Sequence, residues 1–304
     1  MQSFSIAKYP HLAGILFSMI FGLTFMFSKV LLETMSPLGL IAYRFLIAII
    51  VFEIFRRLRL VTIDLKNKSL QPLLLVALFQ PIFYFLFETI GLTFIRSSEA
   101  GMMIALIPIV VALISPLFGK EYPTWIQFLF ISLSVSGVVF INVMKASVGD
   151  DINVLGVFLV FMAVVSAALF NMFSRRGSTH FRPAEITYVM MLTGAVVFNI
   201  IYIVELILQD NVGAYISSLS VSSIGPLLYL GIIASIGGFF LVNTSLSRLP
   251  AHVSSVYANL ATVVSVIAGV VVLQESISWF HYVGAAMIIT GVYGTARFRR
   301  KVSV

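Results

Sequence analysis

Long uninterrupted apolar runs are the feature that most constrains this chain. Residues 103–118, for example, contain no charged side chain. Over the whole sequence 60% of the residues are apolar and 10% are charged, whereas soluble domains are about half apolar and a quarter charged. A helix needs about 20 mostly apolar residues to cross a bilayer. The sequence therefore predicts a polytopic membrane protein and excludes a pair of soluble domains.

The apolar runs predict helices and not the strands of a transmembrane barrel. Barrel strands alternate apolar and polar residues, and residues 103–118 do not alternate. Reading apolar runs against charged or Gly/Pro-containing breaks predicts an all-α polytopic fold. Its ten transmembrane helices are expected at 12–32, 38–55, 70–95, 98–118, 124–144, 155–174, 184–208, 224–246, 252–273 and 279–298.

The distribution of lysine and arginine predicts the orientation. With ten spans and the N-terminus inside, fifteen basic residues fall on the cytoplasmic side. Only Arg96 and Lys145 fall on the other side, and Lys29 and Arg44 lie within spans. This asymmetry predicts a multi-pass protein of the cytoplasmic membrane with both termini in the cytoplasm. It also explains the net charge of +7 by an anionic membrane surface, without a nucleic-acid partner.

The sequence contains an internal repeat. Displacing it by 154 residues superposes three pairs without a gap: Glu121 on Glu275, Trp125 on Trp279 and Gly137 on Gly291. The predicted halves are residues 1–146 and 147–304, with five helices each, which together form one transport domain. Because five is odd, the second half enters the membrane from the opposite side, as in the inverted repeats of secondary transporters.

Short motifs recur in order along nearly the whole chain. The first half carries Phe21-Gly22-Leu23-Thr24-Phe25-Met26-Phe27-Ser28-Lys29, then Pro37, Arg44-Phe45-Leu46-Ile47-Ala48, Pro108, Glu121 and Gly137-Val138. The second half carries Leu249-Pro250-Ala251, Gln274-Glu275 and Gly291-Val292. Together these motifs resemble the drug/metabolite transporter superfamily, specifically its ten-helix branch with two EamA domains. The chain departs from the pattern at Phe21, usually Trp, and at Thr262, often Pro.

The resemblance implies a solute carrier with a central cavity between two repeats. The family includes exporters of amino acids and other metabolites, drug efflux proteins and some importers. The expected function is therefore secondary active transport of a small metabolite or drug-like solute by alternating access. Export, for instance of an amino acid or a related metabolite, is the favoured direction. A facilitative channel or exchanger, or a lipid-carrier translocating protein, is the alternative.

Other classes of chemistry find little support in the sequence. There is no cysteine, and the four histidines lack the spacing of metal ligands, so neither a metal nor a cofactor is expected. The aspartates offer one adjacent pair, Asp150 and Asp151, in a loop, which disfavours an enzyme. Phosphate-binding loops are missing, which disfavours ATP hydrolysis. The driving force is then expected from a proton, another ion or the solute's own gradient, with protons as the candidate coupling ion. The expected partners are a small-molecule solute and the bilayer, for a monomer or a homodimer.

Ionisable residues within predicted spans are the first candidates for a site, because charge is costly in lipid. Glu88 follows Tyr84 by one helical turn, and Phe87 lies beside it. Such a carboxylate can hold a cation or carry a proton, so Glu88 is the candidate for proton coupling. Alternatively it is a structural partner of Lys29 or Arg44. Those two basic residues are expected chiefly to snorkel or to form ion pairs near the outer helix ends, and direct contact with the solute is the alternative.

Polar and aromatic positions on other spans complete the predicted binding surface. Small polar residues also bridge helices, which is the alternative role, above all for Asn171. Glu205 is expected to reach the interface in a structural role. The predicted substrate-binding residues are Tyr84, Phe87, Glu88, Asn171, Phe239, Asn243, Ser255 and Asn259. Pro81 and Pro108 lie inside expected helices, where a proline frees a carbonyl, and are candidates for hinges or static bends.

Overall fold

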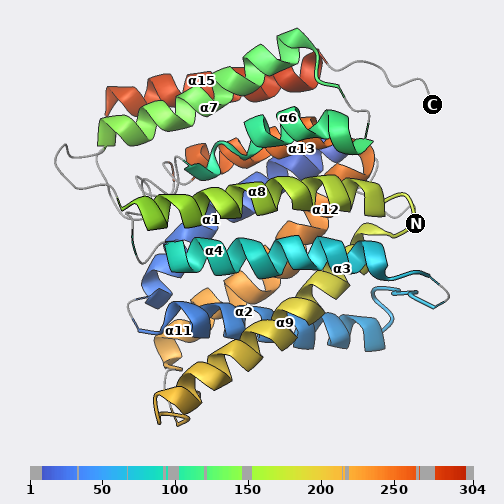
Figure 1. Ribbon diagram of the computed structural model, residues 1–304, viewed down its shortest axis with the longest axis vertical. Helices are drawn as coiled ribbons and strands as arrows, with labels where there is room; N and C mark the ends of the chain where they lie inside the picture. The colour runs from blue at the N-terminus through green and yellow to red at the C-terminus, as the bar shows by residue number, and fades with distance from the viewer. Residues whose placement is uncertain are drawn as a thin grey trace.

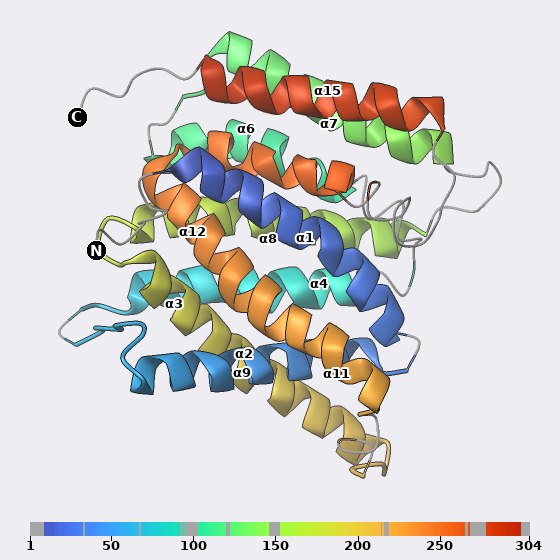
Figure 2. The ribbon, with the colours of Figure 1, turned by 180° about the vertical axis from the view of Figure 1, so that it is seen from behind.

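The computed structural model describes the chain at residues 9–32, 34–66, 68–91, 94, 103–119, 122–145, 153–213, 215, 219–264, 267 and 278–298. These residues form an all-helical fold, and no strand occurs among them. Most helices run side by side across the long axis of the molecule (Figures 1 and 2). The prediction of an all-α fold is confirmed for this part of the chain.

The helices follow the predicted spans closely. In the first half they are α1 (Pro10–Leu32), α2 (Pro37–Arg57), α3 (Gln71–Ala77), the π-helical segment η2 (Leu78–Phe83), α4 (Tyr84–Gly91), α6 (Ile107–Gly119) and α7 (Trp125–Lys145). In the second half they are α8 (Val154–Gly177), α9 (Pro183–Leu208), α11 (Val221–Leu228), the π-helical segment η3 (Tyr229–Gly238), α12 (Phe239–Arg248), α13 (Ala251–Val256), the 3-10 turn η4 (Tyr257–Asn259) and α15 (Trp279–Arg297).

Several of these helices are suited to a bilayer. Five helical stretches are long and apolar enough to cross it: Pro37–Arg57, Gln71–Gly91, Val154–Gly177, Pro183–Leu208 and Val221–Arg248. Shorter apolar stretches occupy Pro10–Thr24, Ile107–Phe118 and Trp125–Ile141. The structure therefore supports a multi-pass helical membrane protein, and the number of ten spans stays a prediction.

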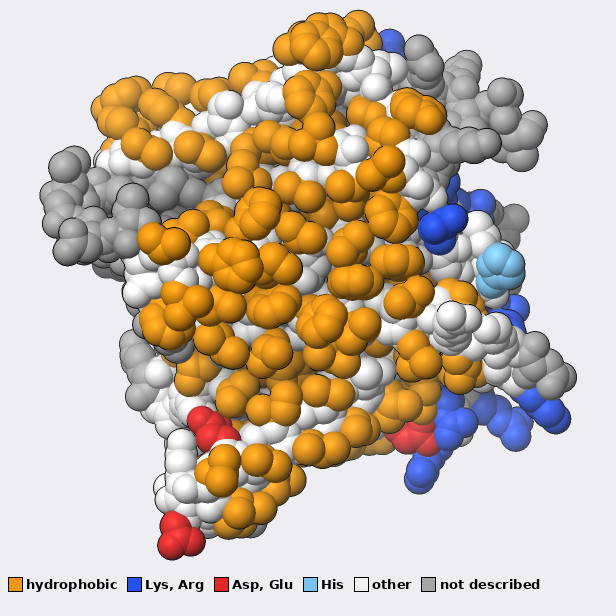
Figure 3. All heavy atoms as spheres, viewed as in Figure 1, with side chains coloured by type: hydrophobic (Ala, Val, Ile, Leu, Met, Phe, Trp, Pro, Cys, Tyr) orange, Lys and Arg blue, Asp and Glu red, His pale blue; other side chains and the backbone are white. Residues whose placement is uncertain are grey.

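The surface has the pattern expected of a protein embedded in lipid. Apolar side chains cover the face seen in Figure 3, and lysine and arginine gather along one edge of it. Large apolar residues are strongly exposed, for example Leu117 at 82% and Val221 at 89%. Water would penalise an apolar surface of this extent, whereas lipid accepts it.

Local signals in the sequence fix where two of the long helices begin. Pro37 and Pro183 occupy the first turn of α2 and α9, where a proline needs no hydrogen-bond donor. The Ser36 hydroxyl accepts a hydrogen bond from the Gly39 N–H at 3.1 Å. The Glu185 carboxylate accepts one from the Arg182 N–H at 2.9 Å. These starts lie one residue before the predicted ones.

The predicted continuous helix over 70–95 is interrupted in the structure. The segment divides into α3, η2 and α4, and Gln80 has an extended backbone, with φ −148° and ψ 117°. Pro81 follows directly and lacks the N–H that would continue the helical ladder. Residues 92–93 and 95 at the predicted end lie outside the described part of the chain.

The predicted continuous helix over 224–246 is also modified. Its middle third is the π-helical segment η3, and the Ser235 hydroxyl donates to the Leu230 carbonyl, five residues back, at 2.8 Å. Segments of π-helix occur frequently at functional sites. This helix and the one over 70–95, its predicted counterpart in the first half, both depart from a regular α-helix in their middle part.

Two other predicted helices differ in their bounds or extent. The sequence predicts a continuous helix over 98–118, but a turn at residues 105–106 separates the helical residues 103–104 from α6, so Pro108 lies in the first turn of α6. Residues 98–102 lie outside the described part of the chain. The proline inside α6 is Pro116. The predicted helix over 252–273 is described as far as residue 264, and most of the remainder lies outside the described residues.

Helices from the two halves pack against one another throughout the bundle. At one end of the long axis α7 lies beside α15, and at the other end α2 lies beside α9 (Figures 1 and 2). Between them α6 packs on α13, α4 packs on α8, and α1 packs on η3 and α12. A Cβ on Gly137 would lie 2.7 Å from the Gly284 carbonyl oxygen, so glycine is what permits the close approach of α7 and α15.

Candidate functional site

Arg44 places a positive charge inside the bundle. It lies on α2 with 7% of its surface exposed, and its Nε donates to the Ser235 hydroxyl on η3 at 2.7 Å. Its guanidinium carbon lies 5.1 Å from the centroid of the Phe85 ring on α4. Three elements from both halves thus meet at this side chain. The expectation that Arg44 snorkels or pairs near an outer end does not describe this geometry.

Glu88 supplies a negative charge close to Arg44. Its Oε1 accepts a hydrogen bond from the Tyr84 hydroxyl at 3.1 Å, and both residues are partly buried on α4. The charges of Glu88 and Arg44 interact, but the ion pairs among the described residues do not include one between them. The side chain of Lys29, the other predicted partner, lies outside the described part of the chain.

Both charged groups retain capacity for further hydrogen bonds. A guanidinium has five N–H donors, and the hydrogen bonds described for Arg44 use one of them. A carboxylate accepts at two oxygens, and Glu88 receives one described donor. Opposite charges held apart in a membrane protein are therefore available to a ligand that reaches both.

The neighbouring surface of α4 and η2 is aromatic. Phe87 stacks on Phe83 with ring centroids 5.7 Å apart, and Tyr84 meets Phe85 edge to face at 5.2 Å. The structure thus joins Tyr84 to Glu88 and stacks Phe87 on Phe83, and the role of all three predicted residues as solute ligands stays a prediction. Pro81 precedes them at the interruption of the helix.

Asn243 lies at a different place in the bundle. It is fully buried on α12, where it accepts from the Ser174 hydroxyl at 2.6 Å and donates to the Thr187 hydroxyl at 2.9 Å. Its amide thereby joins α12 to α8 and α9. This geometry favours the role of a bridge between helices.

The remaining predicted residues also have protein partners. Asn171 donates to the Ala167 carbonyl of its own helix at 2.8 Å, and Asn259 donates to the Ser134 hydroxyl on α7 at 3.2 Å. Ser255 donates to the His252 carbonyl at 3.3 Å, and Phe239 is a core residue with 2% exposed. None of their described contacts joins them to Glu88, so the eight predicted residues do not form one cluster.

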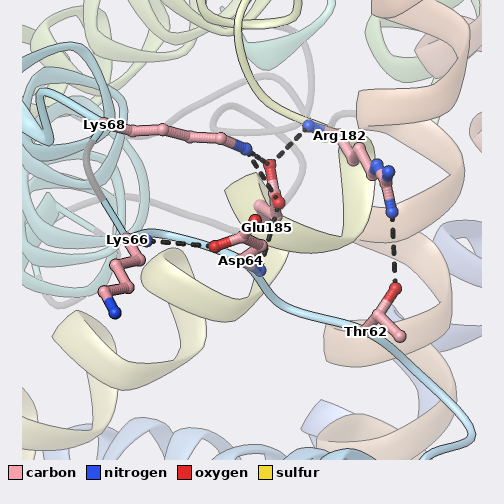
Figure 4. A network of polar contacts seen from close by, with 6 residues as sticks. All are labelled: Thr62, Asp64, Lys66, Lys68, Arg182 and Glu185. Carbon is pink, nitrogen blue, oxygen red and sulfur yellow. Dashed lines mark hydrogen bonds and ion pairs between the residues drawn. The ribbon is translucent and has the colours of Figure 1, made fainter.

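A second polar cluster lies where the loop after α2 meets the start of α9 (Figure 4). The Glu185 side chain is 1% exposed and binds Lys68 Nζ at 2.9 Å. The same carboxylate accepts from the N–H groups of Asp64 at 3.2 Å and Arg182 at 2.9 Å. The Arg182 guanidinium reaches the Thr62 hydroxyl at 3.4 Å. This cluster fastens a loop of the first half to a helix of the second.

The sequence analysis singles out Arg44 but favours a structural role for it, and it does not single out Lys68 or Glu185. The motif Arg44-Phe45 marks Arg44, but only the packing of α2 against η3 reveals its partner. Among the described residues, no group of three or more His, Cys, Asp or Glu side chains could hold a metal ion.

Comparison with known proteins agrees with this architecture. The model of the EamA-like transporter family matches residues 8–143 and again residues 154–297. The uncharacterized transporter YcxC of Bacillus subtilis (strain 168) is 36% identical over 286 residues, which are 94% of this chain and 92% of that protein. An uncharacterized transporter of Archaeoglobus fulgidus is 26% identical over 278 residues, 91% of this chain and 95% of its own.

Two further comparisons concern a named function and the fold. A protein of Escherichia coli (strain K12) named as a probable amino-acid metabolite efflux pump is 27% identical over 181 residues, 57% of this chain and 60% of that protein. A crystal structure with 18% identity superposes with a TM-score of 0.79 over 98% of this chain and 99% of its own, which shows a shared fold. The chain is a transporter in a membrane and belongs to the EamA-like transporter family.

Proposed function

We propose that this transporter is a secondary active carrier that exports a small metabolite by alternating access. The observation that carries the proposal is the pair of charges from the first half, Arg44 and Glu88, held apart where the second half supplies Ser235. Ionisable groups inside membrane helices usually mark the path of a substrate or a proton. A site shared between two halves is also where a rocking motion would change access.

The proposed architecture is two inverted five-helix repeats, residues 1–146 and 147–304, with ten spans and both termini in the cytoplasm. The packing supports it, because exchanging each helix for its counterpart in the other half preserves the main contacts. The contacts of α2 with α9, of α7 with α15 and of α6 with α13 each join a helix to its own counterpart, so the exchange leaves them unchanged. It maps the contact of α4 with α8 onto that of α1 with η3 and α12. A pseudo-two-fold axis would produce this pattern.

The proposed driving force is a proton gradient, with Glu88 as the coupling group. Glu88 is a partly buried carboxylate on α4 that accepts a hydrogen bond from Tyr84 and interacts electrostatically with Arg44. We assign the interruption at Gln80 and Pro81 as a hinge, because the helical ladder is already broken there. Pro108 lies in the first turn of α6, where a proline interrupts no helical hydrogen bond, so we do not propose it as a second hinge.

Export is the proposed direction, with an amino acid or a related metabolite as the class of solute. The name of the Escherichia coli relative supports this choice. A facilitator, an exchanger or a lipid-translocating protein is the alternative, and the experiment below separates it from a proton-coupled carrier.

The test is solute-evoked proton flux in proteoliposomes that contain a pH-sensitive dye, screened over amino acids, amines, nucleosides and cationic drugs. We expect Glu88→Gln to abolish the proton flux that a solute evokes, because an amide side chain does not bind and release a proton near neutral pH. Glu205→Gln is the matched control, since Glu205 is a second carboxylate within a membrane helix, α9, and no described hydrogen bond or ion pair joins it to Arg44 or Tyr84. Normal proton flux in Glu88→Gln would remove Glu88 from the coupling step. Solute counterflow without any proton flux in the wild type would indicate a facilitator or an exchanger.

A further inference from the structure

Arg44 is a buried cation that no described carboxylate neutralises in an ion pair. It is 7% exposed, and its described hydrogen bond goes to a neutral hydroxyl. Arginine within a transmembrane segment is costly and usually pairs with an anion or faces a cavity. One neutral hydrogen bond and a contact with the face of Phe85 offset only part of that cost. Arg44 can therefore accept an anionic partner from a ligand.

Ser235 determines which edge of the guanidinium stays available. Because Nε binds the Ser235 hydroxyl, the outer edge formed by the two terminal nitrogens remains. No hydrogen bond among the described residues engages those nitrogens. Two parallel N–H groups match the two oxygens of a carboxylate, which is the geometry that arginine offers and lysine does not. The available edge is therefore suited to a carboxylate ligand.

Glu88 restricts what else such a ligand can carry. Its charge interacts with that of Arg44, so a simple anion bound at Arg44 would be repelled by the carboxylate of Glu88. A simple cation bound at Glu88 would be repelled by Arg44 in the same way. A ligand with a negative and a positive group a few bonds apart satisfies both residues. Tyr84, Phe85 and Phe87 on the same helix favour an apolar or aromatic remainder.

We infer that Arg44 is a substrate-binding residue that receives the carboxylate of an amino-acid-like zwitterion, whose ammonium group faces Glu88. The inference rests on the proposed transport function and names the class of solute for that site. Ser235 acts as a positioning residue, because it holds the guanidinium by Nε. The contact couples solute recognition in the first half to η3 in the second half.

Equilibrium binding to the purified full chain tests the inference separately from transport. Calorimetry in detergent compares three probes of one shape: phenylalanine, 2-phenylethylamine, which lacks the carboxylate, and 3-phenylpropionate, which lacks the ammonium group. In the wild type we expect phenylalanine to bind at least about tenfold more tightly than either analogue, since each analogue leaves one charged group unpaired. In Arg44→Lys we expect the affinity for phenylalanine to fall at least about tenfold and that for the amine to stay unchanged.

The amine serves as the internal control, because its unchanged affinity shows that Arg44→Lys is folded and that Glu88 is intact. Equal affinity for phenylalanine and the amine in the wild type would overturn the inference. Unchanged phenylalanine affinity in Arg44→Lys, or no binding of any probe to the wild type, would overturn it as well. The proposed transport function is judged independently by proton flux, so either proposal can fail alone.

Discussion

Asn243 illustrates at the level of single residues how burial changes the meaning of a polar side chain. The sequence analysis includes it among the predicted substrate-binding residues. In the structure its amide is fully buried and bonded to Ser174 and Thr187 from two other helices. A buried polar group with saturated hydrogen bonds is held by its own protein and has little left for a solute.

Asn243→Ala is therefore expected to reduce stability and to leave solute affinity unchanged. Removing the amide leaves two hydroxyl groups without these partners, at a cost of about 1–2 kcal/mol in a membrane protein. The measurement is the free energy of unfolding in detergent, together with the affinity for the best transported solute. Tyr84→Ala is the comparison, because we expect it to lower the affinity. If Asn243→Ala lowered the affinity for solute without loss of stability, Asn243 would again be a candidate substrate-binding residue.

The packing of α7 on α15 shows what individual elements contribute. Gly137 and Gly291, which the internal repeat pairs in sequence, lie on these two neighbouring helices. A Cβ on Gly291 would lie 2.6 Å from the Phe130 carbonyl oxygen, and one on Gly137 would lie 2.7 Å from that of Gly284. Backbone atoms cannot move aside as a flexible side chain can. The repeat in sequence thus corresponds to one glycine-dependent interface in space.

Gly137→Ala is expected to separate these helices and destabilise the protein by about 1–3 kcal/mol, as overpacking does. The measurement is the midpoint of thermal unfolding in detergent, with the yield of monodisperse protein as a second readout. Gly177→Ala at the end of α8 is the matched control, because its nearest atoms lie 4.0 Å away. An equal shift in both variants would show that helix propensity and not close approach sets the effect.

At the scale of the whole molecule, the Glu185 cluster joins the loop after α2, in the first half, to the start of α9, in the second half (Figure 4). Its ion pair joins residues 117 positions apart, from the loop after α2 and from α9. In the proposed alternating-access mechanism the two halves move relative to one another, and these contacts would restrain that motion.

Lys68→Met is expected to destabilise this arrangement by about 3 kcal/mol, because it leaves the buried Glu185 carboxylate without its countercharge. The double variant Lys68→Met and Glu185→Gln should recover much of the loss, which a double-mutant cycle of unfolding free energies measures. Arg56→Met is the control, because the Glu53–Arg56 pair is exposed and we expect little change. Additive effects of the two substitutions would show that Lys68 and Glu185 do not act as a pair.

The sequence by itself determined the helical membrane class and most helix positions, because hydropathy and start signals such as Pro37 and Pro183 act locally. Its ordered motifs also carried the resemblance to the family. It also grouped Tyr84 with Glu88, since one helical turn separates them. The tertiary structure alone decided that Arg44 binds Ser235, 191 residues away, and that Asn243 bridges helices. The partner of a buried polar group depends on how each helix is rotated and packed against others. Uniformly apolar faces leave that rotation unspecified until the whole bundle assembles.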